Sequence, residues 1–251
     1  MNLPESFLAV PIAHRGYHDR AAGRVENSRA AFEAAIAAGY GIELDLQPSK
    51  DGVPMVFHDY DLRRLTGETG PVAQRTAEEL GQITLTGGGE AVPTLAEVLR
   101  LVAGRVPLLI EIKDQDGILG PNVGALERAS AEALAGYRGD VALMSFNPHS
   151  MAAMAELLPE VPRGLVTDDY RPEDWETIPE ARRAELREIP DYDRVGACFI
   201  SHRHGALGDA RVAELKAQGA EILCWTIRSA AEEAKAREIA ANVTFEGYAA
   251  A

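Results

Sequence analysis

Four short polar segments could gather two histidines and three carboxylates around one phosphate group and one metal ion. The segments are Ala13-His14-Arg15-Gly16, Glu43-Leu44-Asp45, Phe57-His58-Asp59 and Glu111-Ile112-Lys113. Each lies at the end of an apolar run that is typical of a β-strand, and charged residues at strand ends usually take part in chemistry rather than in packing. The segments therefore indicate an active site, and the surrounding elements must bring them together.

The three carboxylates are predicted to share one interior. Side chains alternate along a strand, so Glu43 and Asp45 point to the same side, and Glu111 repeats the pattern on a later strand. Uncompensated carboxylates repel one another, so a divalent cation is the natural counter-charge, and oxygen ligands without cysteine suit Mg²⁺ or Ca²⁺. The alternative is a structural salt-bridge network in which Lys113 and Arg15 neutralise the acids.

Length and charge narrow the class of protein. A chain of 251 residues, 46% of them hydrophobic and 25% charged, suits one α/β barrel domain. No segment approaches the roughly 18 apolar residues of a membrane span, so we expect a cytoplasmic protein without an integral membrane segment. The formal net charge of −14 disfavours nucleic acid and anionic membranes as partners. A phosphate-containing substrate then requires a local positive field from a metal, Arg15 and Lys113.

Apolar runs and helical patterns alternate along the whole chain, which predicts a (β/α)₈ TIM barrel. The predicted strands are Leu8 to Ala13, Gly41 to Leu46, Pro107 to Ile112, Val141 to Phe146, Gly164 to Thr167, Ala197 to Ser201, Glu221 to Ile227 and Asn242 to Phe245. The predicted helices are Ser28 to Ala38, Thr94 to Ala103, Val123 to Ala135, Ser150 to Leu158, roughly Pro172 to Glu188, Asp209 to Gln218 and Ser229 to Ala240.

The alternative architecture is a doubly wound open sheet, but the chain has no glycine-rich dinucleotide fingerprint after its first strand and no Walker-type run. We predict a single domain over residues 1–251 with an insertion at about residues 59–93, following a short strand at Pro54 to Phe57. An insertion of this length in a barrel loop is more often a substrate-covering element than an idle linker. Cys198 and Cys224 lie in apolar runs and are expected to be reduced core thiols.

The motifs, in their order, resemble the glycerophosphodiester phosphodiesterase family. The resemblance rests on His-Arg-Gly, Glu-Asn-Ser, Glu-Leu-Asp, Phe-His-Asp after Asp51-Gly52, Ile-Glu-Ile-Lys, Ser145-Phe146-Asn147 and Cys224-Trp225-Thr226, and it spans nearly the whole chain. It implies a TIM barrel that hydrolyses glycerophosphodiesters to sn-glycerol 3-phosphate and an alcohol. It also implies a divalent metal held by Glu43, Asp45 and Glu111, with His14 and His58 as the acid/base pair.

Two positions depart from the family pattern. Arg228 stands where the family commonly has asparagine, and Thr244-Phe245-Glu246 replaces the usual Thr-Asp ending of the eighth strand. We expect neither departure to touch the metal or the histidines. Both are expected to change the shape and charge of the alcohol side of the pocket.

The two histidines match what phosphodiester cleavage demands. One group must take a proton from the nucleophile and another must protonate the leaving alkoxide, and imidazole titrates near neutrality. The roles of His14 and His58 in this pair, and the choice between water and a substrate hydroxyl as nucleophile, stay open. For a single histidine at a strand end, the alternative is a structural role.

The remaining candidates are predicted to bind the substrate. Arg15 offers a planar fork for two phosphate oxygens, and Lys113 adds a point charge, although Arg15 could instead pair with Glu43 or Glu26. Glu26 could lie behind the site or contact a substrate hydroxyl, or could cap a helix with Asn27 or Ser28. Phe146 and Trp225 could line the mouth of the barrel, with core packing as the alternative. His202 and His204 are expected in a solvated loop, and His18 and His149 at the surface.

Two other functions compete with this prediction. A phospholipase D type of phosphodiesterase acting on lysolipids should carry an exposed apolar or basic membrane-docking loop, which is not obvious in this acidic chain. A non-catalytic barrel that binds phosphorylated ligands should have lost a histidine or a metal carboxylate, and none is lost. The sequence does not specify the head group, the preferred metal or the oligomeric state.

Overall fold

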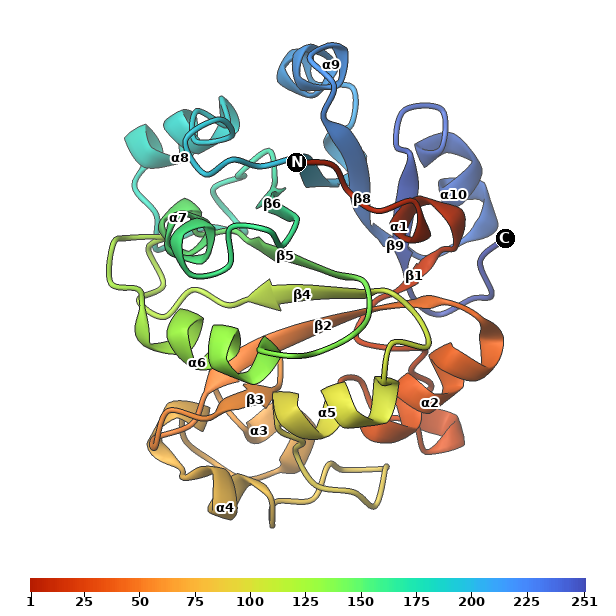
Figure 1. Cartoon of the computed structure of the whole chain (residues 1–251), viewed down its shortest axis with the longest axis vertical. Helices are drawn as coiled ribbons and strands as arrows, with labels where there is room; N and C mark the ends of the chain where they lie inside the picture. Colours follow the sequence, from red (N-terminus) through yellow and green to blue (C-terminus); the bar gives the residue numbers. More distant parts are fainter.

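A computed structural model describes residues 1–251, and the chain folds into a closed barrel of parallel strands surrounded by helices (Figure 1). The strands are β1 (Ile12–Ala13), β2 (Gly41–Pro48), β3 (Pro54–Val56), β4 (Leu108–Ile112), β5 (Val141–Ser145), β6 (Arg163–Thr167), β7 (Phe199–Arg203), β8 (Glu221–Ile227) and β9 (Asn242–Phe245). Their order is β1-β9-β8-β7-β6-β5-β4-β2-β3, and an additional pairing of β1 with β2 closes the barrel. Only β3 is antiparallel, and it pairs with the last residues of β2, from Leu46 to Pro48. The predicted TIM barrel is therefore confirmed.

Most of the helices cover the outside of the barrel. The helices are α1 (Ser6–Ala9), α2 (Arg29–Ala38), α3 (Arg63–Thr66), α4 (Ala77–Leu80), α5 (Leu95–Val102), α6 (Ala125–Leu134), α7 (Pro148–Leu157), α8 (Glu180–Arg187), α9 (Ala210–Ala217) and α10 (Ala230–Ala236), with 3-10 turns at Arg20–Ala22, Val72–Gln74 and His204–Ala206. Local signals set their starts: Ser28 caps α2 through the backbone N–H of Ala31, and Thr94 forms a capping box with Glu97 on α5. None of them has the length and apolar character needed to cross a bilayer.

Inward-pointing side chains stack in layers that alternate strands contribute. In the strand register Met144 of β5 is level with Gly164 of β6, and Gly164 is level with Phe199 of β7. Because the strands are tilted to the barrel axis, the residue of β7 in the same layer as Met144 is two positions further along, at Ser201. The same displacement round the barrel gives three layers: Ile12, Leu109, Gly164 and Leu223; then Glu43, Met144, Ser201 and Thr244; then His14, Glu111, Val166 and Trp225. The first layer is apolar, and the polar groups are in the two nearer the carboxyl ends of the strands.

The apolar end of the barrel is plugged by the N-terminal segment. Leu3 and Phe7 are buried in the same cluster as Ile12 and Leu109. The predicted strand from Leu8 to Ala13 is therefore wrong in its first part, because α1 turns Phe7 under the barrel and only Ile12–Ala13 pairs with neighbouring strands. A hydrophobic plug and a buried strand give the same apolar run in the sequence.

The predicted helix from Pro172 to Glu188 is also too long. Only α8 is helical, and it begins directly after Pro179, whose backbone is extended. A proline disfavours helical backbone in the residue before it, here Ile178, so the helix does not extend into the preceding segment. In that segment Trp175 packs edge-to-face on Phe146, with 5.0 Å between ring centroids.

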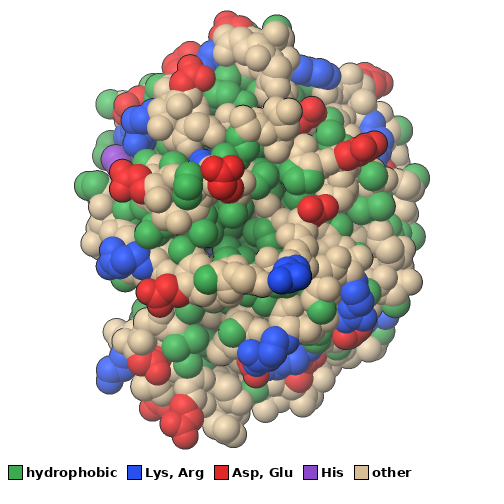
Figure 2. Space-filling view, in the orientation of Figure 1, with side chains coloured by type: hydrophobic (Ala, Val, Ile, Leu, Met, Phe, Trp, Pro, Cys, Tyr) green, Lys and Arg blue, Asp and Glu red, His purple; other side chains and the backbone are tan.

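The segment between β3 and α5 packs on its own apolar cluster, which includes Leu62, Leu65, Val72 and Leu80. It lies at the bottom of Figure 1, below β2 and β4, whose arrows point toward the left of the picture. On the face in Figure 2, acidic and basic side chains are interspersed around a central apolar area, without a basic stripe.

Candidate active site

The three predicted metal ligands come together. Carboxylate oxygens of Glu43, Asp45 and Glu111 lie within 4.8 Å of one another, and all three side chains are buried. Adjacent parallel strands cause this convergence, because Asp45 on β2 is in register with Glu111 on β4, and Glu43 precedes Asp45 by one full alternation. The expectation that these side chains share one interior is confirmed.

The carboxylate set fits a hard divalent ion. Glu43 Oε1 is buried and has no hydrogen-bond partner, while Glu43 Oε2 accepts a hydrogen bond from the backbone N–H of Arg15 at 2.9 Å. Burial, with the charges of Asp45 and Glu111, raises the pKa of Glu43 well above its usual range. A cation among the three carboxylates would supply the missing partner for Glu43 and relieve that repulsion.

Lys113 neutralises part of this cluster. Its Nζ lies 2.8 Å from Asp45 Oδ1 and 2.7 Å from Glu111 Oε1. Burial raises the pKa of Asp45, but Lys113 and the neighbouring cations outweigh it and hold that pKa below its usual range. Asn27 Nδ2 donates to Asp45 Oδ2 at 2.8 Å, which fixes the carboxylate. The salt-bridge network that we posed as an alternative is thus present around Asp45 and Glu111, whereas Glu43 Oε1 remains without a partner.

His14 follows β1 and is held by a carboxylate from the opposite end of the chain. Its Nδ1 lies 2.6 Å from Glu246 Oε2, and its Nε2 lies 4.0 Å from Glu43 Oε2. Burial lowers the pKa of His14 to about 4, against the hydrogen bond to Glu246, which raises it. The imidazole is therefore neutral near pH 7, with Nδ1 carrying the proton toward Glu246 and Nε2 turned to the carboxylate cluster.

The expectation that the two departures leave the histidines untouched is wrong. Glu246 contacts His14 directly, and Arg228 Nη2 pairs with Glu246 Oε1 at 2.8 Å, so the two departures form one unit behind His14. His18, expected at the surface, is partly buried, and its Nε2 lies 3.6 Å from Glu246 Oε2. Glu246 directly follows β9 in the sequence and reaches His14 because β9 is hydrogen-bonded to β1. The spacing between these residues in the sequence carries no sign of this contact.

His58, which follows β3, has a similar arrangement. Its Nδ1 lies 2.7 Å from Asp59 Oδ1, and Asp59 Oδ2 accepts a hydrogen bond from Arg64 Nε at 2.6 Å. Burial raises the pKa of Asp59, but hydrogen bonds to His58 and Arg64 outweigh it and keep that pKa below its usual range. Each histidine thus has an ionised carboxylate on its Nδ1.

Arg15 and Glu26 form an ion pair beside the carboxylates. Arg15 Nη1 lies 2.6 Å from Glu26 Oε1 and its Nε lies 3.4 Å from Asp45 Oδ2. Arg64 also binds both oxygens of Glu26 at 2.7 Å. Burial raises the pKa of Glu26, but Arg64 and Arg15 outweigh it and lower it to about 2. Glu26 does not cap the helix, a role that belongs to Ser28, and it ties Arg15 to the segment after β3.

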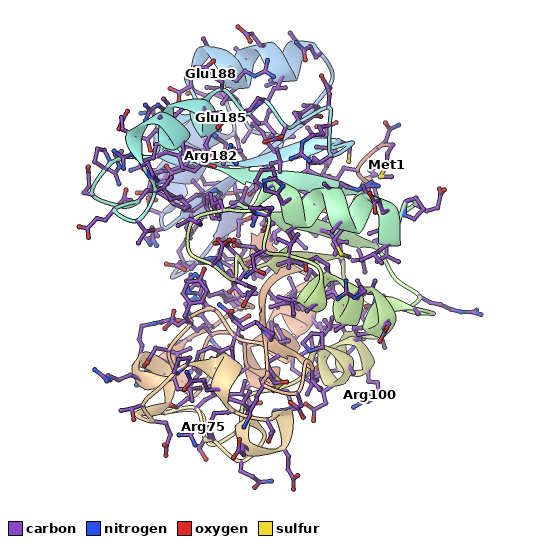
Figure 3. The ribbon with its side chains drawn as sticks, turned by 90° about the vertical axis from the view of Figure 1, so that its left-hand side faces the viewer. Met1, Arg75, Arg100, Arg182, Glu185 and Glu188 are labelled. Atoms are coloured by element: carbon purple, nitrogen blue, oxygen red, sulfur yellow. The ribbon has the colours of Figure 1, made fainter.

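These residues open into two connected spaces. A chamber of about 170 Å³ lies at the mouth of the barrel, and an outer cleft of about 870 Å³ continues from it. Both are lined by His58, Glu111, Lys113 and Phe146. The cleft runs between Arg63 and Arg64 after β3 and Trp175 before α8. In Figure 3 the segment after β3, marked by Arg75, lies below, and α8, marked by Arg182 and Glu185, lies above.

The two predicted aromatic residues meet at the chamber. The rings of Phe146 and Trp225 pack edge-to-face with centroids 5.5 Å apart, and both line the chamber. His202, expected in a solvated loop, is instead buried on β7, where Thr167 Oγ1 lies 2.8 Å from its Nδ1. It alternates with the inward-facing Ser201 and so faces the helices. His204 begins a 3-10 turn after β7.

Comparison with known proteins assigns the family. A profile of the glycerophosphoryl diester phosphodiesterase family matches residues 14–244. The chain belongs to this family. It is therefore an enzyme that hydrolyses glycerophosphodiesters, and the resemblance seen in the sequence motifs is confirmed.

Curated relatives and solved structures agree with the family assignment. A glycerophosphodiester phosphodiesterase of Bacillus subtilis is 27% identical, over 98% of this chain and 86% of the relative. Another, from Caldanaerobacter subterraneus, is 34% identical over 65% of this chain and 69% of its own length. The solved phosphodiesterase of Thermotoga maritima superposes with a TM-score of 0.70 at 25% identity, covering 94% of each chain. That of Oleispira antarctica, solved with the product sn-glycerol-3-phosphate, gives a TM-score of 0.77 at 23% identity, over 96% of this chain and 94% of that one.

Proposed function

We propose that this phosphodiesterase is metal-dependent and cleaves small glycerophosphodiesters to sn-glycerol 3-phosphate and an alcohol, with His14 and His58 as the acid/base pair. The observation that carries the proposal is the buried carboxylate cluster with its unpartnered Glu43 Oε1, flanked by two histidines that line the same chamber. Mg²⁺ or Ca²⁺ on Glu43, Asp45 and Glu111 would polarise the phosphate and stabilise its developing charge.

The residues of the chain supply the proton transfers. One imidazole takes the proton of the attacking hydroxyl, and the other protonates the leaving alkoxide, each acting through Nε2 because a carboxylate occupies the region of Nδ1. Glu246 and Asp59 orient the rings and stabilise the imidazolium form. The two histidines come from different strand ends, His14 after β1 and His58 after β3, and both line the chamber, which suits these two separate tasks.

The cations bind and neutralise the phosphate. Arg15 presents a guanidinium whose Nη1 is held by Glu26, and Lys113 presents an ammonium between Asp45 and Glu111. With an ion held by Glu43, Asp45 and Glu111, the Lys113 ammonium would be free to donate to a phosphate oxygen. These short-range charges let a chain with a formal charge of −14 accept an anionic substrate.

The test is a panel of purified diesters incubated with the protein and Mg²⁺ or Ca²⁺, with coupled detection of glycerol 3-phosphate. We expect turnover of water-soluble glycerophosphodiesters. A diester that lacks glycerol, such as bis(p-nitrophenyl) phosphate, should be hydrolysed much more slowly. Failure to release glycerol 3-phosphate from every member of the panel would overturn the proposal.

The outer cleft supports a second candidate, a phospholipase D type of activity on lysolipids. Its volume of about 870 Å³ exceeds the need of a small alcohol, and Tyr60 at its edge and Ile118 beside it are about half exposed. Lysophosphatidylcholine therefore belongs in the panel. Faster release of choline from it than from glycerophosphocholine would favour this candidate.

A further inference from the structure

The floor of the chamber carries two hydroxyl groups that the proposed chemistry does not use. Ser201 on β7 and Thr244 on β9 are neighbouring members of the layer that also holds Glu43 and Met144. The strand register places all four side chains at one level, pointing to the barrel axis. A molecule that sits on the axis in front of the Glu43 carboxylate therefore meets both hydroxyls.

Neither hydroxyl has a partner within the protein. Ser201 Oγ and Thr244 Oγ1 are buried, make no hydrogen bond, and belong to residues that line the chamber. Their neighbours cannot satisfy them: Met144 and Val166 are apolar, and the indole N–H of Trp225 donates to the backbone carbonyl of Ser201 at 2.9 Å. Burying a hydroxyl without a hydrogen-bond partner costs free energy, so a polar ligand group inside the chamber would stabilise both hydroxyls.

The chamber has one charged rim and one mostly uncharged floor. His14, Arg15, Glu111 and Lys113 line the rim, which places the phosphate there, whereas the floor layer carries the Glu43 carboxylate, the apolar Met144 and the two hydroxyls. At about 170 Å³ the chamber is far below the roughly 300–1,000 Å³ of pockets for drug-sized ligands, so it fits one end of a diester only. The other end must extend into the outer cleft of about 870 Å³.

We propose that Ser201 and Thr244 form a diol-recognition site that binds the two glycerol hydroxyls of the substrate and selects glycerol for the chamber. This inference rests on the proposed function, because it takes the phosphate to bind at the charged rim. A vicinal diol offers two donors and several acceptor lone pairs, and each protein hydroxyl can donate to it and accept from it. The carbon chain of glycerol would lie on Met144, Val166 and Trp225, and the leaving alcohol would occupy the outer cleft.

The test separates the hydroxyls from the phosphate by binding rather than by turnover. Calorimetry in the presence of Mg²⁺ compares sn-glycerol 3-phosphate with n-propyl phosphate, which has the same carbon chain and phosphate but no hydroxyls. Wild type should prefer sn-glycerol 3-phosphate by about 5- to 100-fold, the range for two ordinary hydrogen bonds. Ser201→Ala and Thr244→Val should each weaken the binding of sn-glycerol 3-phosphate by about 2- to 10-fold and leave the affinity for n-propyl phosphate unchanged.

Ser130→Ala is the matched control. Ser130 Oγ is also buried without a partner, but Ser130 lies on α6 and does not line the chamber, so this variant should bind both ligands as wild type does. Equal affinity of the wild type for the two ligands overturns the proposal without any variant. The proposal is also overturned if a variant at Ser201 or Thr244 binds both ligands more weakly by the same factor while its free energy of unfolding equals that of wild type.

The outcome is distinguishable from failure of the proposed function. If no diester is hydrolysed but sn-glycerol 3-phosphate is bound with this discrimination, the diol-recognition site stands and the proposed catalysis falls. If diesters are hydrolysed and the discrimination is absent, the catalysis stands and the diol-recognition site falls.

Discussion

Glu246→Gln should slow catalysis with little change in KM. Glu246 Oε2 lies 2.6 Å from His14 Nδ1, and Glu246 does not line the chamber. The carboxylate keeps the proton on Nδ1 and stabilises the imidazolium that forms when Nε2 takes a proton, and glutamine retains the shape without the charge. Hydrogen bonds to charged groups contribute about 1.5 to 3 kcal/mol, and about half of that is lost when the acceptor becomes neutral. At about 1.4 kcal/mol per tenfold, kcat should fall by about 3- to 12-fold.

The assay is steady-state release of glycerol 3-phosphate from a glycerophosphodiester, with separate kcat and KM. Arg228→Gln is the control: Arg228 is exposed and pairs with the other oxygen of Glu246 at 2.8 Å, so its loss should lower kcat less than Glu246→Gln does, by about twofold or less. The Glu246→Gln variant should also lower the pKa of His14 measured by NMR, because the hydrogen bond to Glu246 raises that pKa against burial. Unchanged kcat, or a loss confined to KM, would refute the positioning of His14 by Glu246.

Three further expectations test other parts of the structure. Lys113→Met should lower kcat/KM by about 10- to 100-fold, because the phosphate loses a buried cation, and the loss should persist across ionic strength; an unchanged value would leave Lys113 with only its ion pairs to Asp45 and Glu111. Gly164→Ala should lower the free energy of unfolding by about 1–3 kcal/mol in urea, because a Cβ there would lie 2.5 Å from the Phe199 ring; wild-type stability would contradict the assigned packing. Burial lowers the pKa of His202, so its folded state resists protonation and the stability from this residue is lost as pH falls below about 6.5. Between about pH 7.5 and about pH 5.5 the free energy of unfolding should therefore fall more for wild type than for His202→Gln. Parallel pH curves of the free energy of unfolding would contradict this.

The sequence was sufficient where local chemistry and strand period act together. Glu43, Asp45 and Glu111 were predictable as a cluster because alternation fixes their common face and parallel register fixes their level. The barrel followed from eight alternating units, each marked by an apolar run and a helical pattern. The range of the single domain and the roles of the individual site residues stay predictions.

Contacts between distant parts of the chain were not predictable. Glu246 reaches His14 across 232 positions, and the contact arises only when the barrel closes through β1 and β9. Ser201 and Thr244 are ordinary strand residues until the register places them in one layer with Glu43. The apolar run around Phe7 led to a predicted strand that is too long. Apolar residues that plug a barrel end and apolar residues in a barrel strand give the same pattern in the sequence.

The central claim is that Glu43, Asp45 and Glu111 hold one divalent ion that the reaction requires. The most direct measurement titrates chelated protein with Mg²⁺ and Ca²⁺, following ion binding by calorimetry and release of glycerol 3-phosphate in parallel, for wild type and Glu43→Gln. We expect the chelated wild type to be inactive, activity to return as one ion binds per chain, and Glu43→Gln to bind that ion at least about tenfold more weakly. Full activity in excess EDTA, or an unchanged ion affinity in Glu43→Gln, would contradict the account.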